Sequence, residues 1–143
     1  MVRFGALSRI KSVVLFLMLL ACCEISLARG IKSVTIDEVG IVRPESEQKD
    51  EALIFWCRAF RPTVAQVRRY FANAVPVPPV VTSHDRYSPC AAKGTVTFKD
   101  GFRADWILYS DGSARIDWQA GGHVYLLLKD NKWYDPIGPY DQG

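Results

Sequence analysis

The stretch from Gly94 to Pro136 constrains the fold more than any other part of the chain, because three glycine-containing turns divide it at short intervals. The turns are Lys99-Asp100-Gly101, Ser110-Asp111-Gly112 and Ala120-Gly121-Gly122. Each contains glycine where a hairpin loop needs a residue in the left-handed conformation. We therefore predict an antiparallel meander over this stretch.

The register of this meander follows from the apolar residues. Three-residue loops place Val96 opposite Ala104 at the first turn and Trp106 opposite Ile116 at the second. The same loop length at the third turn places Ile116 opposite Leu126. All three turns give one buried face, and a slip of one residue would turn that face to solvent.

The opposite face of the meander is mixed in character. In this register Asp105 lies directly opposite Asp117, and facing like charges destabilise a sheet unless cations lie beside them. Arg103 and Arg115 lie on the diagonals. A solvated checkerboard of charges is the interpretation we favour. A partner-binding surface, a carboxylate pair holding a cation, or a small hydrolase using Asp105 and Asp117 are the alternatives.

The N-terminus has the pattern of an export signal. Basic residues precede an apolar run from Ser12 to Cys23, and Ser26-Leu27-Ala28 supplies small residues for signal-peptidase cleavage. We predict a signal peptide over residues 1–28 and export to the periplasm or the medium. The alternative is an envelope lipoprotein of structural role, because Leu19-Leu20-Ala21-Cys22 approximates a lipobox with Cys22 as the lipidated residue. The chain would contact a membrane only in that case.

Residues 29–143 have the length of a single domain with a modest core. The formal net charge of +3 falls to +1 without the signal, since 15 basic and 14 acidic residues remain. This balance offers no basic footprint for a nucleic acid. The two histidines, His84 and His123, come without spaced ligands, and we predict neither a metal site nor a cofactor.

Two of the four cysteines lie outside the predicted signal. Cys57 and Cys90 would enter an oxidising compartment, and we predict a disulfide between them. In the chain-entropy treatment, closing a loop of about 34 residues stabilises a fold by roughly 3 to 4 kcal/mol.

Upstream of the meander, the alternation of Val34 and Ile36 predicts a first strand, and the apolar run 52–57 reads as another. Thr63 and Gln66 have the spacing of a capping box, and Val64, Val67, Phe71 and Ala74 form the apolar stripe of a helix. The proline-rich segment 75–80 reads as an extended, polyproline-like connector.

These elements predict an α+β fold with a four- to five-stranded antiparallel meander, one helix on its apolar face and one disulfide. A non-catalytic binding protein suits the absence of any catalytic motif from the sequence. Candidate partner contacts come from the helix and from the loop before Cys90: Arg68, Arg69, His84, Asp85, Arg86 and Tyr87.

Several short motifs also resemble a group of small exported proteins of Gram-negative bacteria. They are Cys57-x-x-Phe60-x-Pro62-Thr63, Tyr70-Phe71-x-x-Ala74, Ser88-Pro89-Cys90-x-x-x-Gly94, Asp100-Gly101, Trp106 and Trp133-Tyr134-Asp135-Pro136. Some exported proteins of this style are immunity proteins that neutralise toxins delivered by type VI secretion. The resemblance therefore implies a secreted, cell-wall-targeting toxin as the partner.

Overall fold

The computed structural model describes residues 30–46, 50–85 and 87–138, and only the backbone of residues 84 and 85. These residues form six strands and three helices. The strands are β1 (Ile31–Val42), β2 (Val75–Val77), β3 (Cys90–Phe98), β4 (Arg103–Tyr109), β5 (Ser113–Trp118) and β6 (His123–Leu127). The helices are α2 (Glu51–Cys57), α3 (Val64–Asn73) and the π-helix η1 (Val81–Asp85).

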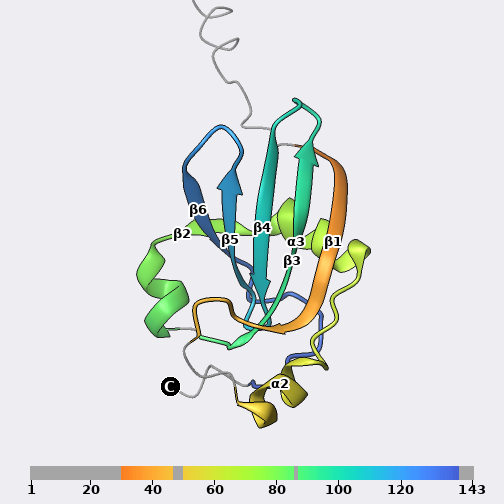
Figure 1. The fold of residues 1–143 in the computed structure, drawn as a ribbon. Coiled ribbons are helices and arrows are strands. Elements are labelled where there is room, and N and C mark those ends of the chain that lie inside the picture. The colour runs from red at the N-terminus through yellow and green to blue at the C-terminus, as the bar shows by residue number, and fades with distance from the viewer. Residues whose placement is uncertain (1–29, 47–49, 86, 139–143) are drawn as a thin grey trace, which may run out of the picture.

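All six strands belong to one antiparallel sheet in the order β1-β3-β4-β5-β6-β2 (Figure 1). The α+β class and the predicted disulfide are confirmed, and the sheet has more strands than the four or five expected. The additional strand is β2, in the segment predicted to be a polyproline-like connector. Pro76 lacks an amide hydrogen but is tolerated there because β2 lies at the edge of the sheet and pairs with β6 alone.

The first two hairpins have the predicted register. Val96 lies opposite Ala104, and Trp106 lies opposite Ile116. The third hairpin differs by two residues, because Ile116 lies opposite Val124 rather than Leu126.

The third turn explains this difference. The amide of Trp118 donates to the carbonyl oxygen of Gly122 at 3.0 Å, so the three-residue loop is 119–121 rather than 120–122. Gly121 and Gly122 both have positive φ, 100° and 83°. Either glycine suits a left-handed position, so the sequence alone does not decide whether the loop is 119–121 or 120–122. A shift of two residues leaves every side chain on its predicted face.

The run 52–57 is a helix, and the predicted strand there is wrong. The side chain of Asp50 accepts a hydrogen bond from the amide of Leu53 at 2.7 Å and caps the helix. Leu53 and Cys57 are four residues apart and share one helix face, on which Cys57 is fully buried. The Asp50 cap and the four-residue spacing of Leu53 and Cys57 therefore favour a helix, although a continuous apolar run is typical of a buried strand.

Helix α3 begins with the predicted capping box. The Thr63 hydroxyl accepts from the Gln66 amide at 3.2 Å, and the Gln66 side chain accepts from the Thr63 amide at 2.8 Å. Val67 and Tyr70 are buried, whereas Val64, predicted to belong to the core stripe, is 47% exposed. Val64 lies in the first turn, so only the later turns of α3 contribute fully buried side chains to the core.

The path of α3 determines which part of the sheet it covers. Arg68 donates hydrogen bonds to the carbonyl oxygens of Ile31 and Lys32 on β1, each at 3.2 Å. The C-terminal end of α3 leads into β2. Since β1 and β2 are the two edges of the sheet, α3 crosses behind the strands from one edge toward the other (Figure 1).

The core lies between α3 and the predicted apolar face of the sheet. Trp106 is 1% exposed, and the ring of Phe71 on α3 lies 5.9 Å from it. At the other end of the core, Trp133 packs against Phe60 and Tyr70, with ring centroids 5.8 and 5.6 Å apart. The segment after β6 thus closes the core without forming another strand.

Candidate functional site

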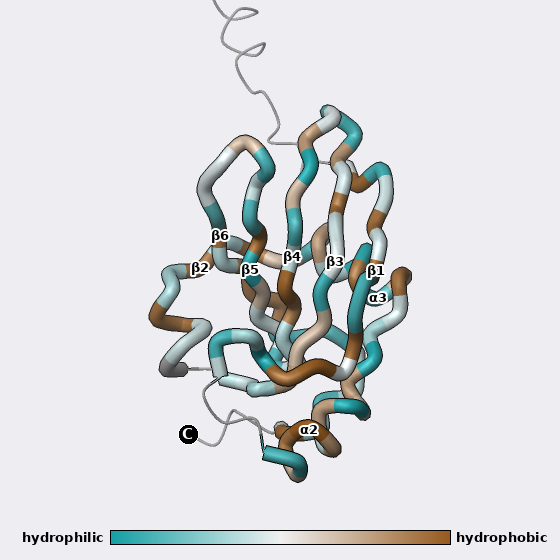
Figure 2. The backbone as a smooth tube through the Cα atoms, in the orientation of Figure 1, coloured by the Kyte–Doolittle hydropathy of each residue, from teal (hydrophilic) through white to brown (hydrophobic). Residues whose placement is uncertain are grey.

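Helix α2 exposes three large apolar side chains side by side. Phe55 is 65% exposed, Trp56 is 56% exposed and Ile54 is 38% exposed. The rings of Phe55 and Trp56 form an edge-to-face pair with centroids 5.8 Å apart. We call these three residues the α2 aromatic surface. Figure 2 shows this hydrophobic segment at the end of the molecule opposite the β3–β4 and β5–β6 loops.

The α2 aromatic surface is held on a rigid base. Cys57, the last residue of α2, forms the disulfide with Cys90 at the start of β3, and both cysteines are completely buried. The chain then turns through hydrogen bonds from the Ala59 amide to Trp56 and from the Phe60 amide to Cys57. Phe60 is also fully buried. The covalent bond and this anchor fix the helix, so its exposed rings are presented in a defined direction.

Charged residues lie on both sides of the α2 aromatic surface. Asp50 and Glu51 stand at the N-terminal end of α2, and Arg58 and Arg61 follow its C-terminal end. All four side chains belong to exposed residues. Aromatic and arginine side chains are the types enriched where protein interfaces derive most of their binding energy.

The sequence analysis missed this surface because a continuous apolar run of six residues reads as a buried strand. The signal was present in the letters. Asp50 followed by Glu51 is a helix start, and the spacing of Leu53 and Cys57 assigns one face to the core. The remaining apolar side chains then have to point outward.

Two of the predicted partner contacts lie on α3 and have intramolecular partners. Arg68 bonds the carbonyl oxygens of β1 described above, and Arg69 lies 3.9 Å from the carboxylate of Asp130. Both residues remain exposed.

The other predicted contacts belong to the segment before Cys90. Tyr87 is 43% exposed, and its ring centroid lies 4.7 Å from the guanidinium of Arg43. The backbones of His84 and Asp85 belong to η1, and Arg86 lies outside the described residues. Arg68 contacts the first residues of β1, whereas Arg43 follows its last residue. The structure therefore places Arg68 and Tyr87 at opposite ends of a twelve-residue strand and does not bring them together.

Arg43 forms a cluster with tyrosines at one end of the outer sheet face. Its guanidinium lies 3.6 Å from the ring centroid of Tyr109, and its Nε lies 3.7 Å from Glu45. Burial raises the pKa of Tyr109 to about 12, with Arg43 opposing and Glu45 adding to the shift. Burial also raises the pKa of Asp111, although hydrogen bonds from Ser113 act in the opposite direction. The cluster borders a depression of about 290 Å³.

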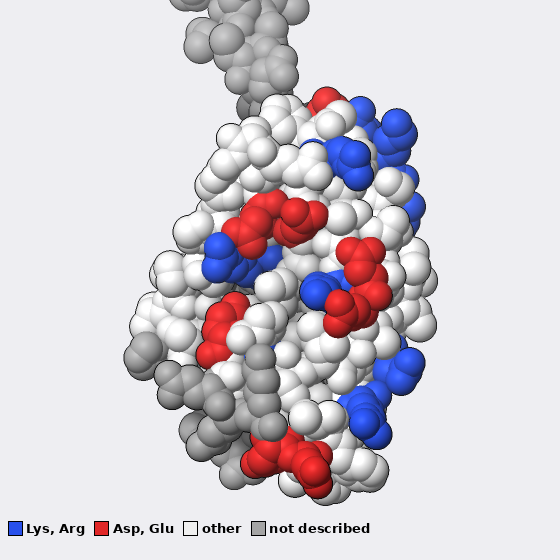
Figure 3. All heavy atoms as spheres, in the orientation of Figure 1, with Lys and Arg blue, Asp and Glu red and all other residues white. Residues whose placement is uncertain are grey.

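Asp105 and Asp117 lie directly opposite each other, as predicted. With Asp37 and Lys93 they border a second depression of about 300 Å³ on the outer face of the sheet. Arg115 donates to Asp117 from Nη2 at 2.6 Å and from Nε at 3.0 Å. This bonding raises the pKa of Arg115. Figure 3 shows acidic and basic groups next to one another across this face.

Within the described ranges, no three His, Cys, Asp or Glu side chains are grouped as ligands for a metal ion. No helix among those residues has the length and apolar character needed to cross a bilayer. Comparisons with protein-family models, with curated proteins and with solved structures give no match to this chain.

Proposed function

We propose that this chain is an exported, non-catalytic binding protein that docks on a protein partner through the α2 aromatic surface. The observation that carries the proposal is the exposure of Phe55 and Trp56, 65% and 56%, on a helix anchored by a buried disulfide. Adjacent exposed aromatic rings are costly to leave in water. A partner that covers them would gain binding free energy without first having to order the helix.

The chemistry around the rings specifies the partner further. Ile54, Phe55 and Trp56 require an apolar depression on the partner, and Arg58 and Arg61 favour acidic groups at one rim of it. The partner implied by the sequence resemblance, a secreted cell-wall-targeting toxin, would present such a depression at or beside its active site. Neutralisation then follows from steric blockage of that site.

The test compares capture of partners by wild-type protein and by a Phe55→Ser/Trp56→Ser variant. The tagged chain is produced in the bacterium in which it occurs naturally and is recovered from the periplasm. Proteins bound to it are identified by mass spectrometry. The matched control is Phe102→Ser, which removes a 46% exposed ring from the β3–β4 loop at the other end of the sheet. Each captured protein is then purified and titrated by calorimetry against all three forms.

We expect a stoichiometric partner that binds the wild type and Phe102→Ser equally and the double variant at least 100-fold more weakly, since two interface aromatics are removed. If purified partners bind all three forms with the same affinity, the α2 aromatic surface is not the docking site. If anionic vesicles bind the wild type and no protein does, the surface is a membrane contact.

A small hydrolase is the second candidate, because Asp105 and Asp117 face each other beside a depression. A hydrolytic activity of the purified chain that disappears in Asp105→Ala and Asp117→Ala, with the fold intact, would favour it.

Lipidation at Cys22 has a separate test. Radiolabelled palmitate that enters the wild type but not a Cys22→Ser variant would place the chain on a membrane.

A further inference from the structure

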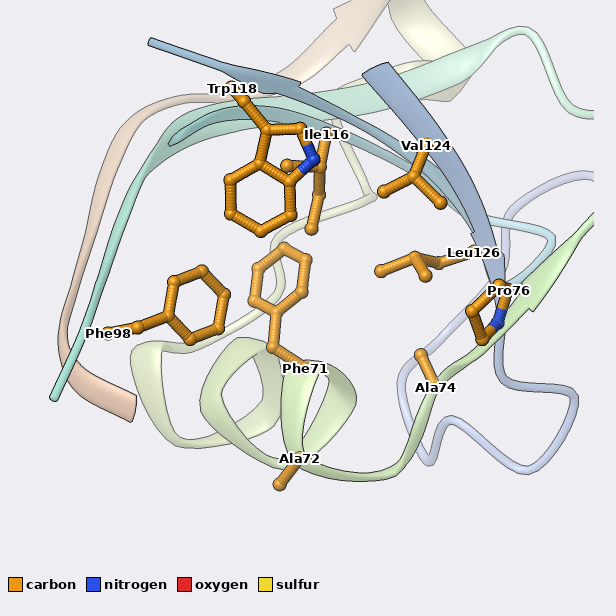
Figure 4. Close-up of a pocket in the computed structure, with 9 residues that line it drawn as sticks. All are labelled: Phe71, Ala72, Ala74, Pro76, Phe98, Ile116, Trp118, Val124 and Leu126. Carbon is orange, nitrogen blue, oxygen red and sulfur yellow. The ribbon is translucent and has the colours of Figure 1, made fainter. Parts of the chain in front are cut away.

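A second apolar feature lies between α3 and the end of the sheet that carries the β3–β4 and β5–β6 loops, which we call the hairpin end. Helix α2 lies at the opposite end of the sheet (Figure 1). The feature is a pocket of about 400 Å³ lined by nine residues, none of which carries a charge. Figure 4 shows the rings of Phe71, Phe98 and Trp118 on one side of it and Val124, Leu126 and Pro76 on the other. We call it the hairpin-end pocket.

The pocket exists because α3 crosses the strands rather than running along them. Phe98 and Trp118 are the last residues of β3 and β5, beyond the level at which Phe71 packs on Trp106. Their rings lie against each other with centroids 5.6 Å apart. The apolar face of the sheet therefore extends past the helix, and the space beside Phe71 is open.

Basic side chains predominate at the same end of the sheet. Ile31 pairs with Phe98, and the amide of Lys99 donates to the carbonyl oxygen of Gly30 at 2.7 Å, which brings the start of β1 beside Lys99. Lys32, Lys99 and Arg103 are exposed there, together with the acidic residue Asp100. Figure 3, which views the face of the sheet opposite α3, shows mainly basic groups along the upper right margin of that face.

We propose that the hairpin-end pocket binds the aliphatic chain of a free medium-chain carboxylate, with the carboxylate directed toward Lys32 and Lys99. The pocket volume lies in the range of small-ligand sites, which typically measure about 300 to 1,000 Å³. An uncharged apolar lining suits a hydrocarbon chain, and the excess of basic groups at the sheet end suits an anionic head. The proposal rests on residues separate from the α2 aromatic surface.

Calorimetric titrations with decanoate and with 1-decanol test both parts of the proposal. Chain burial predicts that affinity falls about fourfold for each methylene removed from decanoate. The charge predicts that decanoate binds more tightly than 1-decanol, and that Lys99→Glu weakens decanoate about three- to fivefold without affecting the alcohol. Raising the salt concentration should weaken only the anionic ligand.

Filling the pocket tests the location. Ala74 lines the pocket at the end of α3, and Ala74→Phe should abolish decanoate binding. Ala65→Phe is the control, because Ala65 is exposed on the same helix and does not line the pocket. Circular dichroism and thermal unfolding verify the fold, and Val124→Phe fills the pocket from the opposite wall if Ala74→Phe does not fold.

Loss of decanoate binding in a folded pocket-filling variant, with retention in Ala65→Phe, is the expected result. Undiminished binding in that folded variant would overturn the proposal. Equal affinity for decanoate and 1-decanol, unaffected by Lys99→Glu, would overturn the assignment of an anionic ligand. Binding to anionic phospholipid vesicles without binding of monomeric decanoate would overturn it in favour of a membrane surface.

Discussion

Gly94 has no side chain, and this allows β1, β3 and Trp106 to pack at their observed separation. A Cβ atom built on Gly94 would overlap the carbonyl oxygen of Thr35 and would lie 2.6 Å from Cζ2 of Trp106. The Thr35 oxygen belongs to the backbone of a paired strand, and Trp106 is fully enclosed. Neither neighbour can move away without disturbing the core.

We predict that Gly94→Ala lowers the free energy of unfolding by at least about 3 kcal/mol, as severe overpacking does. Gly101→Ala is the matched control. Gly101 has φ of 89° and nothing within 4 Å of a built Cβ, so its replacement should cost only about 1 to 2 kcal/mol of backbone strain. Urea unfolding of both variants measures the difference. Similar losses in the two would contradict the close approach at Gly94.

A second residue-scale prediction concerns alkaline pH. Burial raises the pKa of Tyr109 from 10.0 to about 12, so the folded state keeps this phenol protonated at pH values where the unfolded chain has released the proton. The unfolded state therefore gains stability between pH 10 and pH 12, and the folded protein loses roughly 2 to 3 kcal/mol across that window. Below pH 10 this contribution to stability is fully present.

Tyr109→Phe should remove that loss, because phenylalanine keeps the ring over Arg43 but does not ionise. Tyr134→Phe serves as the control, since Tyr134 is 68% exposed. Denaturant unfolding at pH 9 and at pH 11.5 gives the comparison. If the wild type and Tyr109→Phe lose the same free energy between these pH values, Tyr109 does not carry the effect.

At the scale of elements, α2 depends on its covalent attachment. It has only seven residues, too few to be stable as an isolated helix. Asp50 caps one end, and the Cys57–Cys90 disulfide holds the other end against β3. The presentation of the α2 aromatic surface is therefore linked to the oxidation state of the two cysteines.

Replacing both cysteines with serine should lower the free energy of unfolding by roughly 3 to 4 kcal/mol and weaken docking of the partner. Thr63→Ala provides the comparison, because loss of the α3 cap costs about 1 kcal/mol without touching α2. Chemical unfolding and partner titration are measured on both variants at low temperature. Full partner affinity in the folded double-serine variant would show that α2 does not need the disulfide for docking.

Some elements could be predicted from the sequence and others could not, and the difference lies in how well their local signals agree. The first two hairpins and α3 have signals that agree with one another, since turn residues, apolar periodicity and a capping box indicate the same element. In α2 the signals conflict, because the apolar run is typical of a buried strand whereas Asp50 caps a helix. In β2 the prolines argued against a strand, but pairing with β6 at the sheet edge needs no amide from Pro76.

The candidate site was less predictable than the fold for a related reason. A sequence pattern separates apolar from polar residues, but it does not show how far a helix covers a sheet. Exposure of Phe55 and Trp56 follows from the position of α2 at one end of the molecule. The hairpin-end pocket likewise follows from the direction in which α3 crosses the strands.

At the scale of the whole molecule, the two proposed binding features lie at opposite ends of the sheet. Figure 1 shows α2 at the end where β3 starts and the β3–β4 and β5–β6 loops at the other. Residues far apart with no shared partners usually contribute additively. The two sites should therefore act independently.

We accordingly predict that Phe55→Ser/Trp56→Ser leaves decanoate affinity unchanged and that Ala74→Phe leaves partner affinity unchanged, each within about twofold. Calorimetry of each single-site variant and of the combined variant, with both ligands, measures the coupling. A variant at one site that changes the affinity of the other site by more than about tenfold would show that the two sites are coupled.

The two edge strands have a further consequence for how copies of this chain meet one another. β2 has three residues, and Pro76 at its centre offers no amide to an incoming strand. β1 is long, but its pairing is interrupted by register shifts, and it carries the acidic residues Asp37 and Glu38. Short, proline-bearing or irregular charged edges oppose the strand-by-strand addition that starts amyloid-like aggregation. The sheet is therefore protected at both margins against growth into a fibril, even where the protein accumulates to high concentration.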